Sequence, residues 1–424
     1  MQIYTKRNLD DIPQLGSLSR EQRRDIRVVS EVLPFRVNRY VLDELISWED
    51  APNDPIFKLV FPSREMLDAV EFSALSSLID ANADAQAISE LVRKIQSKLN
   101  PHPGGQTTLN LPRVGNEELW GLQHKYRETL LFFPSQGQTC HTYCSFCFRW
   151  AQFIDDVQLR MMARENAKLL TYLESHREIT DLLITGGDPM VMKTVALEKH
   201  LKPILEPRFD HVQNIRIGTK SLSFWPYRFV TDPDADDLLR LFSTLVNRGK
   251  HVAVMAHFDH PRELSPPVVE HAIRRIRDTG AVIRTQAPLL RGVNDSSDIW
   301  ADMWRQQVLL GMSPYYMLVE RDTGAHRYFE LPLEIALDVY RGAMRQLSGL
   351  ARTARGPVMS TGPGKVEIQG VAEVGGQKVF LLRFIQARNV DWTFQPFFAE
   401  YDPTAVWFEQ LKPAFGEAKF PFEK

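Results

Sequence analysis

From about residue 128 onward, short apolar segments alternate with amphipathic segments, and this alternation constrains the fold more than any other feature of the sequence. The apolar segments have the length and composition of strands, and the stretches between them have the apolar spacing of helices. Repeats of this kind build a parallel sheet through right-handed crossovers. The predicted strands cover residues 129–135, 179–187, 212–219, 250–258, 281–290 and 313–320, and the predicted helices cover residues 163–174, 234–249, 268–280 and 296–311.

Six predicted strands indicate an α/β fold in the form of a partial (β/α)6 barrel, two units short of the closed form. Ligands bind at the carboxyl ends of the strands in such sheets. Polar residues directly after a predicted strand are therefore candidate site residues.

Two further regions flank the predicted barrel, which we place at residues 106–350. Residues 1–105 predict a helical N-terminal region that ends in a turn-rich segment, with Ser17 and Ser19 as candidate helix caps. Residues 351–424 form a C-terminal extension rich in Phe and Trp. The helical spacing of the N-terminal region covers residues 20–33, 63–79 and 85–99.

The aromatic residues of the C-terminal extension are more numerous than a surface tail needs. We expect them to pack against the core or against a second copy of the chain in a homodimer. The alternative is a lid that keeps water away from a reactive intermediate.

All three cysteines of the 424-residue chain, Cys140, Cys144 and Cys147, fall in one eight-residue window after the first predicted strand. The spacing C-x3-C-x2-C can hold three irons of a 4Fe-4S cluster and leave the fourth iron a free coordination position. A structural zinc would need a fourth ligand, for which His141 is the nearby candidate. An electron-transfer cluster would need a fourth cysteine, and disulfides would leave one cysteine over. We therefore favour the open iron-sulfur cluster.

The composition is that of an ordinary globular enzyme, with 44% hydrophobic and 25% charged residues. The chain has 51 basic and 53 acidic residues, so its net charge of −2 gives no general attraction for nucleic acid. The sequence shows no membrane span and no targeting segment, and free thiols suit a reducing compartment. We expect a cytoplasmic protein without a nucleic-acid or membrane partner.

A series of short strings resembles, in order and spacing, the radical S-adenosylmethionine (SAM) enzymes and, among them, the lysine 2,3-aminomutase family. The resemblance implies a radical SAM isomerase of the aminomutase type, with a 4Fe-4S cluster, SAM and pyridoxal phosphate (PLP) as cofactors. It also implies an external electron donor of the flavodoxin or ferredoxin type. The strings are NDPIFKLVFPS, HKYRETLLFF, CSFCFRW, LLITGGDP, IRIGTK, AHFDHP, LLRGVND, SPYY and GPGKVEI.

The reaction that the resemblance implies converts an α-amino acid into a β-amino acid. A 5′-deoxyadenosyl radical removes hydrogen from the β-carbon of the PLP-bound amino acid, the nitrogen migrates, and hydrogen returns at the α-carbon. The protein's part is to orient the cofactors and to exclude solvent.

Gly186, Gly187 and Asp188 follow the apolar run DLLIT, at the end of the second predicted strand. Glycines there permit close approach of the backbone to a ligand, and Asp188 could accept from an amine. A lone sequence of this kind is more often an ordinary turn. In this position it resembles the motif with which the family holds the SAM amino group.

Lys220, His257 and Gln286 lie at or just past predicted strand ends, facing the same mouth of the sheet. The resemblance implies that they contact SAM, with Lys220 standing where an arginine is usual. A lysine keeps the charge but loses the two-pronged contact with a carboxylate. Each residue could instead be a satisfied polar group at a strand end.

Two basic residues are candidates for catalysis. Arg149, just beyond the last cysteine, suits a carboxylate, and the resemblance implies the α-carboxylate of the substrate. Lys365 could be an exposed lysine after a turn, but its place resembles that of the lysine that carries PLP. Lys125, Tyr126 and Arg127 are then candidates for the cofactor's phosphate site.

The chain departs from the family where the substrate side chain should bind. The loop GPGK is short, the segment RGPVMST lacks an acidic residue, and the family's second acid falls near Arg321 or Asp322. If Arg321 faces the pocket, an acidic substrate is favoured; if Asp322 or Glu320 does, a basic one is. The family's C-terminal cysteine cluster is also absent.

Two other interpretations remain open. The enzyme could use the radical without PLP, on another small molecule or on a lysine of a protein. The chain could also be a non-catalytic redox or binding protein with a degenerate site.

Overall fold

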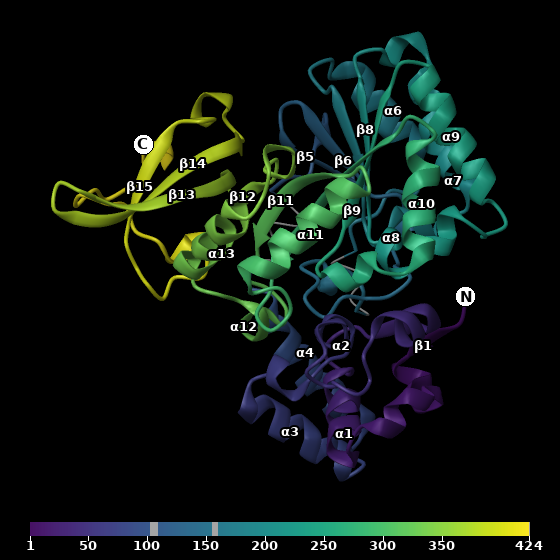
Figure 1. Cartoon of the computed structure of the whole chain (residues 1–424), viewed down its shortest axis with the longest axis vertical. Helices are drawn as coiled ribbons and strands as arrows, with labels where there is room; N and C mark the ends of the chain where they lie inside the picture. The colour runs from purple at the N-terminus through teal and green to yellow at the C-terminus, as the bar shows by residue number, and fades with distance from the viewer. Residues whose placement is uncertain (102–108, 155–159, 424) are drawn as a thin grey trace.

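The computed structural model describes residues 1–101, 109–154 and 160–423. Within these ranges eleven strands form one sheet in the order β15-β14-β13-β12-β11-β10-β9-β8-β7-β6-β5 (Figure 1). Strands β6 to β12 run parallel, whereas β5 and β13 to β15 are antiparallel to their neighbours. The parallel strands are β6 (Thr129–Phe132), β7 (Asp181–Ile184), β8 (Asn214–Thr219), β9 (His251–His257), β10 (Val282–Leu289), β11 (Ser313–Val319) and β12 (Arg355–Ser360).

The six predicted strands are all present, so the α/β class is confirmed. β12 is a seventh parallel strand that the sequence pattern did not indicate, because Gly356 and Pro357 weaken its strand signal. The helices between the strands are α6 (Asn166–Ser175), α7 (Thr194–Leu201), α8 (Ser221–Phe224), α9 (Ala235–Asn247), α10 (Pro267–Arg277), α11 (Ser297–Leu309), α12 (His326–Phe329) and α13 (Leu333–Arg345).

The largest core cluster lies between the sheet and these helices. Strand β8 shows how the sequence builds it, because Ile215 and Ile217 are fully buried in this cluster. Side chains alternate along a strand, so Arg216 between them points to the opposite face. Polar side chains can therefore lie on that opposite face of the sheet and in the loops after the strands.

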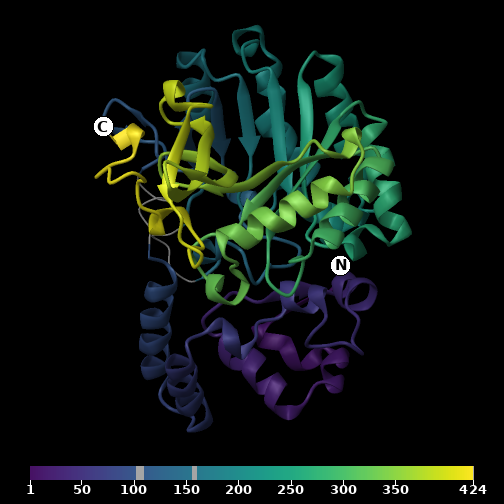
Figure 2. The same cartoon turned by 60° about the vertical axis from the view of Figure 1, so that its left-hand side comes forward.

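The N-terminal region packs against the side of the sheet where the parallel strands end (Figures 1 and 2). Ser19 caps the first helix and Asp68 caps the third, which therefore begins later than the periodicity predicts. The region contains β1 (Ile3–Thr5), α1 (Arg20–Val29), β2 (Arg36–Asn38), α2 (Pro55–Val60), α3 (Ala69–Asp80) and α4 (Ala85–Leu99).

The C-terminal extension continues the sheet. Its strands β13 (Gly364–Val374) and β14 (Gln377–Ala387) form a hairpin, and β15 (Pro396–Glu400) pairs with β14. At the other edge of the sheet β5 (Leu122–Tyr126) pairs with β6, and β3 (Arg113–Val114) pairs with β4 (Glu117–Glu118) in a separate ribbon.

The aromatic residues of the extension pack within the chain. Their rings form a core cluster of their own against the C-terminal strands, so packing explains most of them without a lid or a second copy. No helix in the described part of the chain has the length and apolar character to cross a bilayer. The cluster includes Phe380, Phe384, Phe397, Trp407, Phe408 and Phe420.

Candidate active site

The three cysteines lie in the loop that follows β6, and the N-terminal region holds this loop in place. The backbone N–H of Tyr143 donates to the carbonyl of Arg36 at 2.8 Å, and that of Ser145 donates to the carbonyl of Leu59 at 2.8 Å. The second and third cysteines pack against the apolar core of that region. All three thiols are free and partly buried.

The surroundings of the thiols fit a metal cluster. Burial raises the pKa of Cys140 and Cys144 well above the ordinary thiol value, and it raises the pKa of Cys147 to about 11. The other two thiols add to this effect at Cys140, so the three groups lie within electrostatic reach of one another. Bound iron supplies the positive charge that stabilises thiolates in such a loop.

His141 does not complete a closed zinc site. Its Nδ1 lies 2.8 Å from the hydroxyl of Ser221. Within the described ranges no three His, Cys, Asp or Glu side chains are grouped so that they could hold one metal ion. The cysteines of a 4Fe-4S cluster bind different irons and need not meet at a single ion.

The turn after β7, Gly186–Asp188, packs tightly on the start of the cysteine loop. The N–H of Gly187 donates to the carbonyl of Gly137 at 3.0 Å, and the N–H of Asp188 donates to the carbonyl of Thr139 at 2.7 Å. Gly186 has a φ of +147°. A Cβ at Gly187 would lie 2.6 Å from the backbone nitrogen of Thr139 and closer still to its carbonyl oxygen. Gly187 is therefore required by the close approach of two chain segments, and Gly186 by its positive φ.

The carboxylate of Asp188 is occupied by donors of the protein itself. It accepts from the hydroxyls of Thr219 at 2.7 Å and Ser221 at 3.0 Å, and from the backbone N–H groups of Met190 and Lys220, each at 2.9 Å. Asp188 therefore ties the ends of β7 and β8 together. Direct binding of a ligand amine by this carboxylate stays a prediction.

Lys220 belongs to a buried charge cluster. Its ammonium lies 2.7 Å from Asp259 and 2.7 Å from Glu263, and His257 Nε2 lies 2.9 Å from the other oxygen of Asp259. Burial alone would lower the pKa of Lys220, but the two carboxylates outweigh it and raise that pKa. A contact between Lys220 and a SAM carboxylate stays a prediction, because this ammonium already has two anionic partners.

Asp259 and Glu263 were missed by the sequence reasoning, although both follow a predicted strand. Their cluster lies beside the cysteine loop, because the ring of His257 lies 5.6 Å from that of Phe146, between the second and third cysteines. Gln286 lies on β10 directly opposite His257 on β9. The structure thus brings His257 and Gln286 to the same edge of the sheet.

Lys365 lies at the start of β13, opposite Ser360. Its ammonium lies 4.8 Å from the ring of Tyr316 and 5.7 Å from that of Tyr126. Burial lowers its pKa to about 7, with further lowering by Arg216 and other cations. The lysine is therefore a half-buried amine with a lowered pKa, rather than an exposed lysine after a turn.

Lys125 lies beside Lys365 in a group with an excess of positive charge. Its ammonium donates to the carbonyl of Thr361 in the loop before Lys365. Burial lowers the pKa of Lys125 to about 7, and Arg388, Arg321 and Lys365 lower it further. A phosphate dianion would relieve this repulsion, so the group fits the phosphate of PLP. Arg388 was not singled out from the sequence.

Arg149 extends from the end of the cysteine loop. Its guanidinium carbon lies 4.4 Å from the ring centre of Phe133 and 5.2 Å from that of Phe148. Burial lowers its pKa to about 10, and the charge of Arg321 acts in the same direction. The charge of Arg321 also lowers the pKa of Lys125. Arg321 therefore lies within electrostatic reach of both Arg149, at the end of the cysteine loop, and Lys125, beside Lys365.

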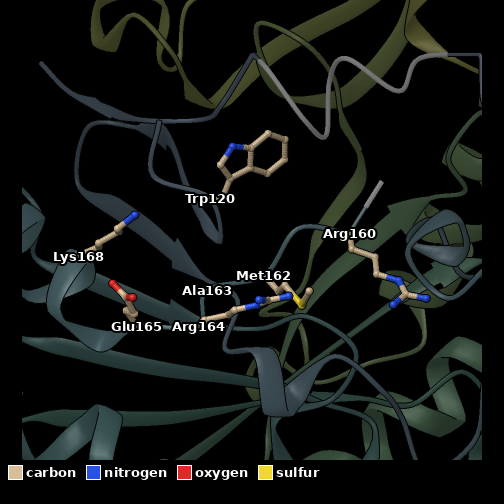
Figure 3. Close-up of a pocket in the computed structure, with 7 residues that line it drawn as sticks. All are labelled: Trp120, Arg160, Met162, Ala163, Arg164, Glu165 and Lys168. Atoms are coloured by element: carbon tan, nitrogen blue, oxygen red, sulfur yellow. The ribbon is translucent and has the colours of Figure 1, made fainter. Parts of the chain in front are cut away.

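A surface pocket of about 510 Å³ is lined by other residues (Figure 3). Trp120 lies across it from the segment that carries Arg164 and Glu165. None of the predicted site residues lines it, and we assign it no part in the site. Its lining residues are Trp120, Arg160, Met162, Ala163, Arg164, Glu165 and Lys168.

Sequence comparison finds relatives along the whole chain. A protein of Aquifex aeolicus described as "Putative L-lysine 2,3-aminomutase" is 31% identical over 409 residues, which is 96% of either chain. Glutamate 2,3-aminomutase of Clostridioides difficile is 26% identical over 50% of this chain and 47% of its own. A radical SAM methyltransferase of Sphaerobacter thermophilus superposes with a TM-score of 0.39 and 16% identity, over 56% of this chain and 68% of its own. No protein-family model matches the chain.

Proposed function

Because the chain belongs to the lysine 2,3-aminomutase family of radical SAM enzymes, we propose that it is a PLP-dependent amino acid 2,3-aminomutase. It converts an α-amino acid into a β-amino acid through a 5′-deoxyadenosyl radical. Its cofactors are a 4Fe-4S cluster on Cys140, Cys144 and Cys147, SAM, and PLP on Lys365. An external donor of the flavodoxin or ferredoxin type supplies the electron.

The cysteine loop and the turn at Gly186–Asp188 support the first half of this proposal. When bound, the cluster passes an electron to SAM and so generates the adenosyl radical. The protein's task is to hold the two loops at a fixed spacing, which the close contact at Gly187 does. His257, Gln286 and Lys220 line the same edge and are the proposed SAM neighbours.

The position and lowered pKa of Lys365 are the observation that supports the second part of the proposal, the use of PLP. When bound, PLP supplies a conjugated system that delocalises an unpaired electron during nitrogen migration. The chain supplies an amine with a pKa of about 7, so a large share of it is neutral and nucleophilic near pH 7, with Lys125 and Tyr126 beside it. Arg149 is the proposed partner of the substrate α-carboxylate.

We also propose how the chain is divided. Residues 1–105 form the helical region that supports the cysteine loop, and residues 106–350 form the radical SAM partial barrel. Residues 351–424 form an extension that delivers Lys365 from the neighbouring hairpin. The six strands β6 to β11 correspond to the (β/α)6 unit of the proposal.

The test is covalent capture of PLP. The purified protein is incubated with PLP, reduced with borohydride, digested and examined by mass spectrometry. We expect a pyridoxyl group on Lys365, its loss in Lys365→Ala, and its retention in Lys378→Ala, which removes a half-exposed lysine on the next strand.

Two outcomes would separate the alternatives. Absence of the label on Lys365, together with SAM cleavage to 5′-deoxyadenosine, would replace the proposal by a radical SAM enzyme that works without PLP. Absence of both would indicate a non-catalytic protein.

A further inference from the structure

Resting on the proposed function, we propose that the substrate is an acidic amino acid whose side-chain carboxylate pairs with Arg321 while its α-carboxylate pairs with Arg149. The sequence leaves the choice open between Arg321 and its acidic neighbours. The arrangement of charges around β11 decides it.

Arg321 is the second residue after β11 and lies at the carboxyl edge of the parallel sheet. Its guanidinium carbon lies 5.4 Å from the ring centre of Phe148 and 6.0 Å from that of Trp407. Its Nε is shielded from solvent and has no hydrogen-bond partner among the described residues. A buried guanidinium nitrogen without an acceptor is costly for a protein unless a ligand completes it.

The acidic residues near Arg321 do not fill this role. The charges of three acidic residues act to raise the pKa of Arg321, namely those of Asp322, Glu409 and Glu320. No described ion pair joins Arg321 to any of them, and Asp322 and Glu409 have interactions of their own.

Glu320 Oε1, like Arg321 Nε, is shielded from solvent and has no hydrogen-bond partner among the described residues. Arg321 is distinguished by its position, because its guanidinium lies against Phe148, the ring that Arg149 also contacts. The positive side chain therefore lies beside the proposed partner of the substrate α-carboxylate.

Arg149 and Arg321 are close enough to hold one small molecule. Their guanidinium carbons lie 5.2 Å and 5.4 Å from the same Phe148 ring, so they can be no further apart than these two distances together. The carboxyl carbons of an extended glutamate are about 5 Å apart. A two-pronged pair adds roughly 4 Å at each end, so the molecule can reach both groups.

The charge balance points the same way. Among the described residues no ion pair joins Arg149 or Arg321 to a carboxylate, and Lys125 and Lys365 lie nearby, with Glu409 as an acidic neighbour of Lys125 and Arg321. A basic substrate side chain would add a cation to this group. The phosphate of PLP and a dicarboxylate would together neutralise it.

The test measures amino acid binding and turnover on the reconstituted protein. Equilibrium dialysis compares radiolabelled glutamate, aspartate, glutamine, asparagine and lysine for wild type, Arg321→Gln, Arg321→Lys and Arg327→Gln. Arg327 is exposed in the same segment, so its variant removes one charge outside the site. 5′-Deoxyadenosine is measured in parallel, and thermal melting checks that each variant is folded.

We expect wild type and Arg327→Gln to bind glutamate or aspartate about tenfold or more tightly than the matching amide. Arg321→Gln should lose this preference, and Arg321→Lys should keep part of it. Equal binding of acid and amide, or a preference for lysine, would overturn the inference. If the preferred amino acid is not acidic, but 5′-deoxyadenosine forms with it and PLP labels Lys365, the inference fails and the proposed function stands. If no amino acid binds and no SAM is cleaved, both fail.

Discussion

At the scale of single residues, the proposed chemistry depends on amines and thiols whose pKa is changed by burial. Lys365 shows this most clearly, because an ordinary lysine is almost wholly protonated at neutral pH and cannot attack an aldehyde. Arg216 and Arg355 lie near enough to disfavour its charge. Nothing in the short sequence GPGK indicates these neighbours, since Arg216 comes from β8 and Arg355 from β12.

The lowered pKa of Lys365 predicts a pH dependence of PLP attachment. Only the neutral amine reacts, so the rate should rise with pH and level off above about 7, the pKa of this lysine in the folded protein. The measurement follows PLP absorbance at a series of pH values, and the Lys365→Ala variant gives the contribution of other lysines to be subtracted. A rate that keeps rising to the ordinary lysine pKa would contradict the account.

At the scale of elements, the spacing between two loops determines whether the site forms. The turn at Gly186–Asp188 and the segment before Cys140 are hydrogen-bonded through their backbones, with no room for a Cβ at Gly187. A glycine pair after an apolar strand indicates close approach. What approaches it could not be predicted, because the partner segment lies at the end of another strand.

This contact predicts the effect of Gly187→Ala. The added methyl group would overlap the backbone of Thr139, which costs roughly 1–3 kcal/mol of folding free energy or separates the two loops. We expect iron content and 5′-deoxyadenosine formation to fall at least several-fold. Gly349→Ala is the matched control, because a Cβ there has no heavy atom within 4 Å. Equal iron content in both variants would show that the contact does not matter.

Elements with strong local signals were predictable, and those with mixed signals were not. α4 has the bounds that its periodicity predicts, whereas β12 was missed. The hairpin β13–β14 had a usable signal, since Gly375 and Gly376 with positive φ separate two alternating strands.

At the scale of the whole molecule, one sheet runs from the cysteine loop to the C-terminal hairpin. β6 precedes the proposed cluster, and β13 carries Lys365. The predicted strands gave six of the seven parallel strands of this sheet, but neither β12 nor the antiparallel extension. The pairing of β12 with β13 depends on contacts between distant segments, which local patterns do not report.

The continuous sheet predicts that the aromatic core of the extension supports Lys365. Phe384 is 1% exposed and its ring lies 5.2 Å from that of Phe397. Phe384→Ala should lower the free energy of unfolding by about 3–5 kcal/mol and weaken PLP capture at Lys365. Phe415→Ala, at a residue that is 47% exposed, should change neither. Urea unfolding and the borohydride label measure the two effects, and equal results for both variants would contradict the prediction.

The most direct test of the whole account is mass spectrometry of the protein reconstituted anaerobically with iron, sulfide and PLP, reduced, and mixed with SAM and amino acids. The account predicts 5′-deoxyadenosine together with a β-amino acid, formed from glutamate or aspartate. It also predicts that both products disappear when Cys140, Cys144 or Cys147 is replaced by Ala. Formation of neither product by a protein whose cysteine loop holds zinc would contradict it.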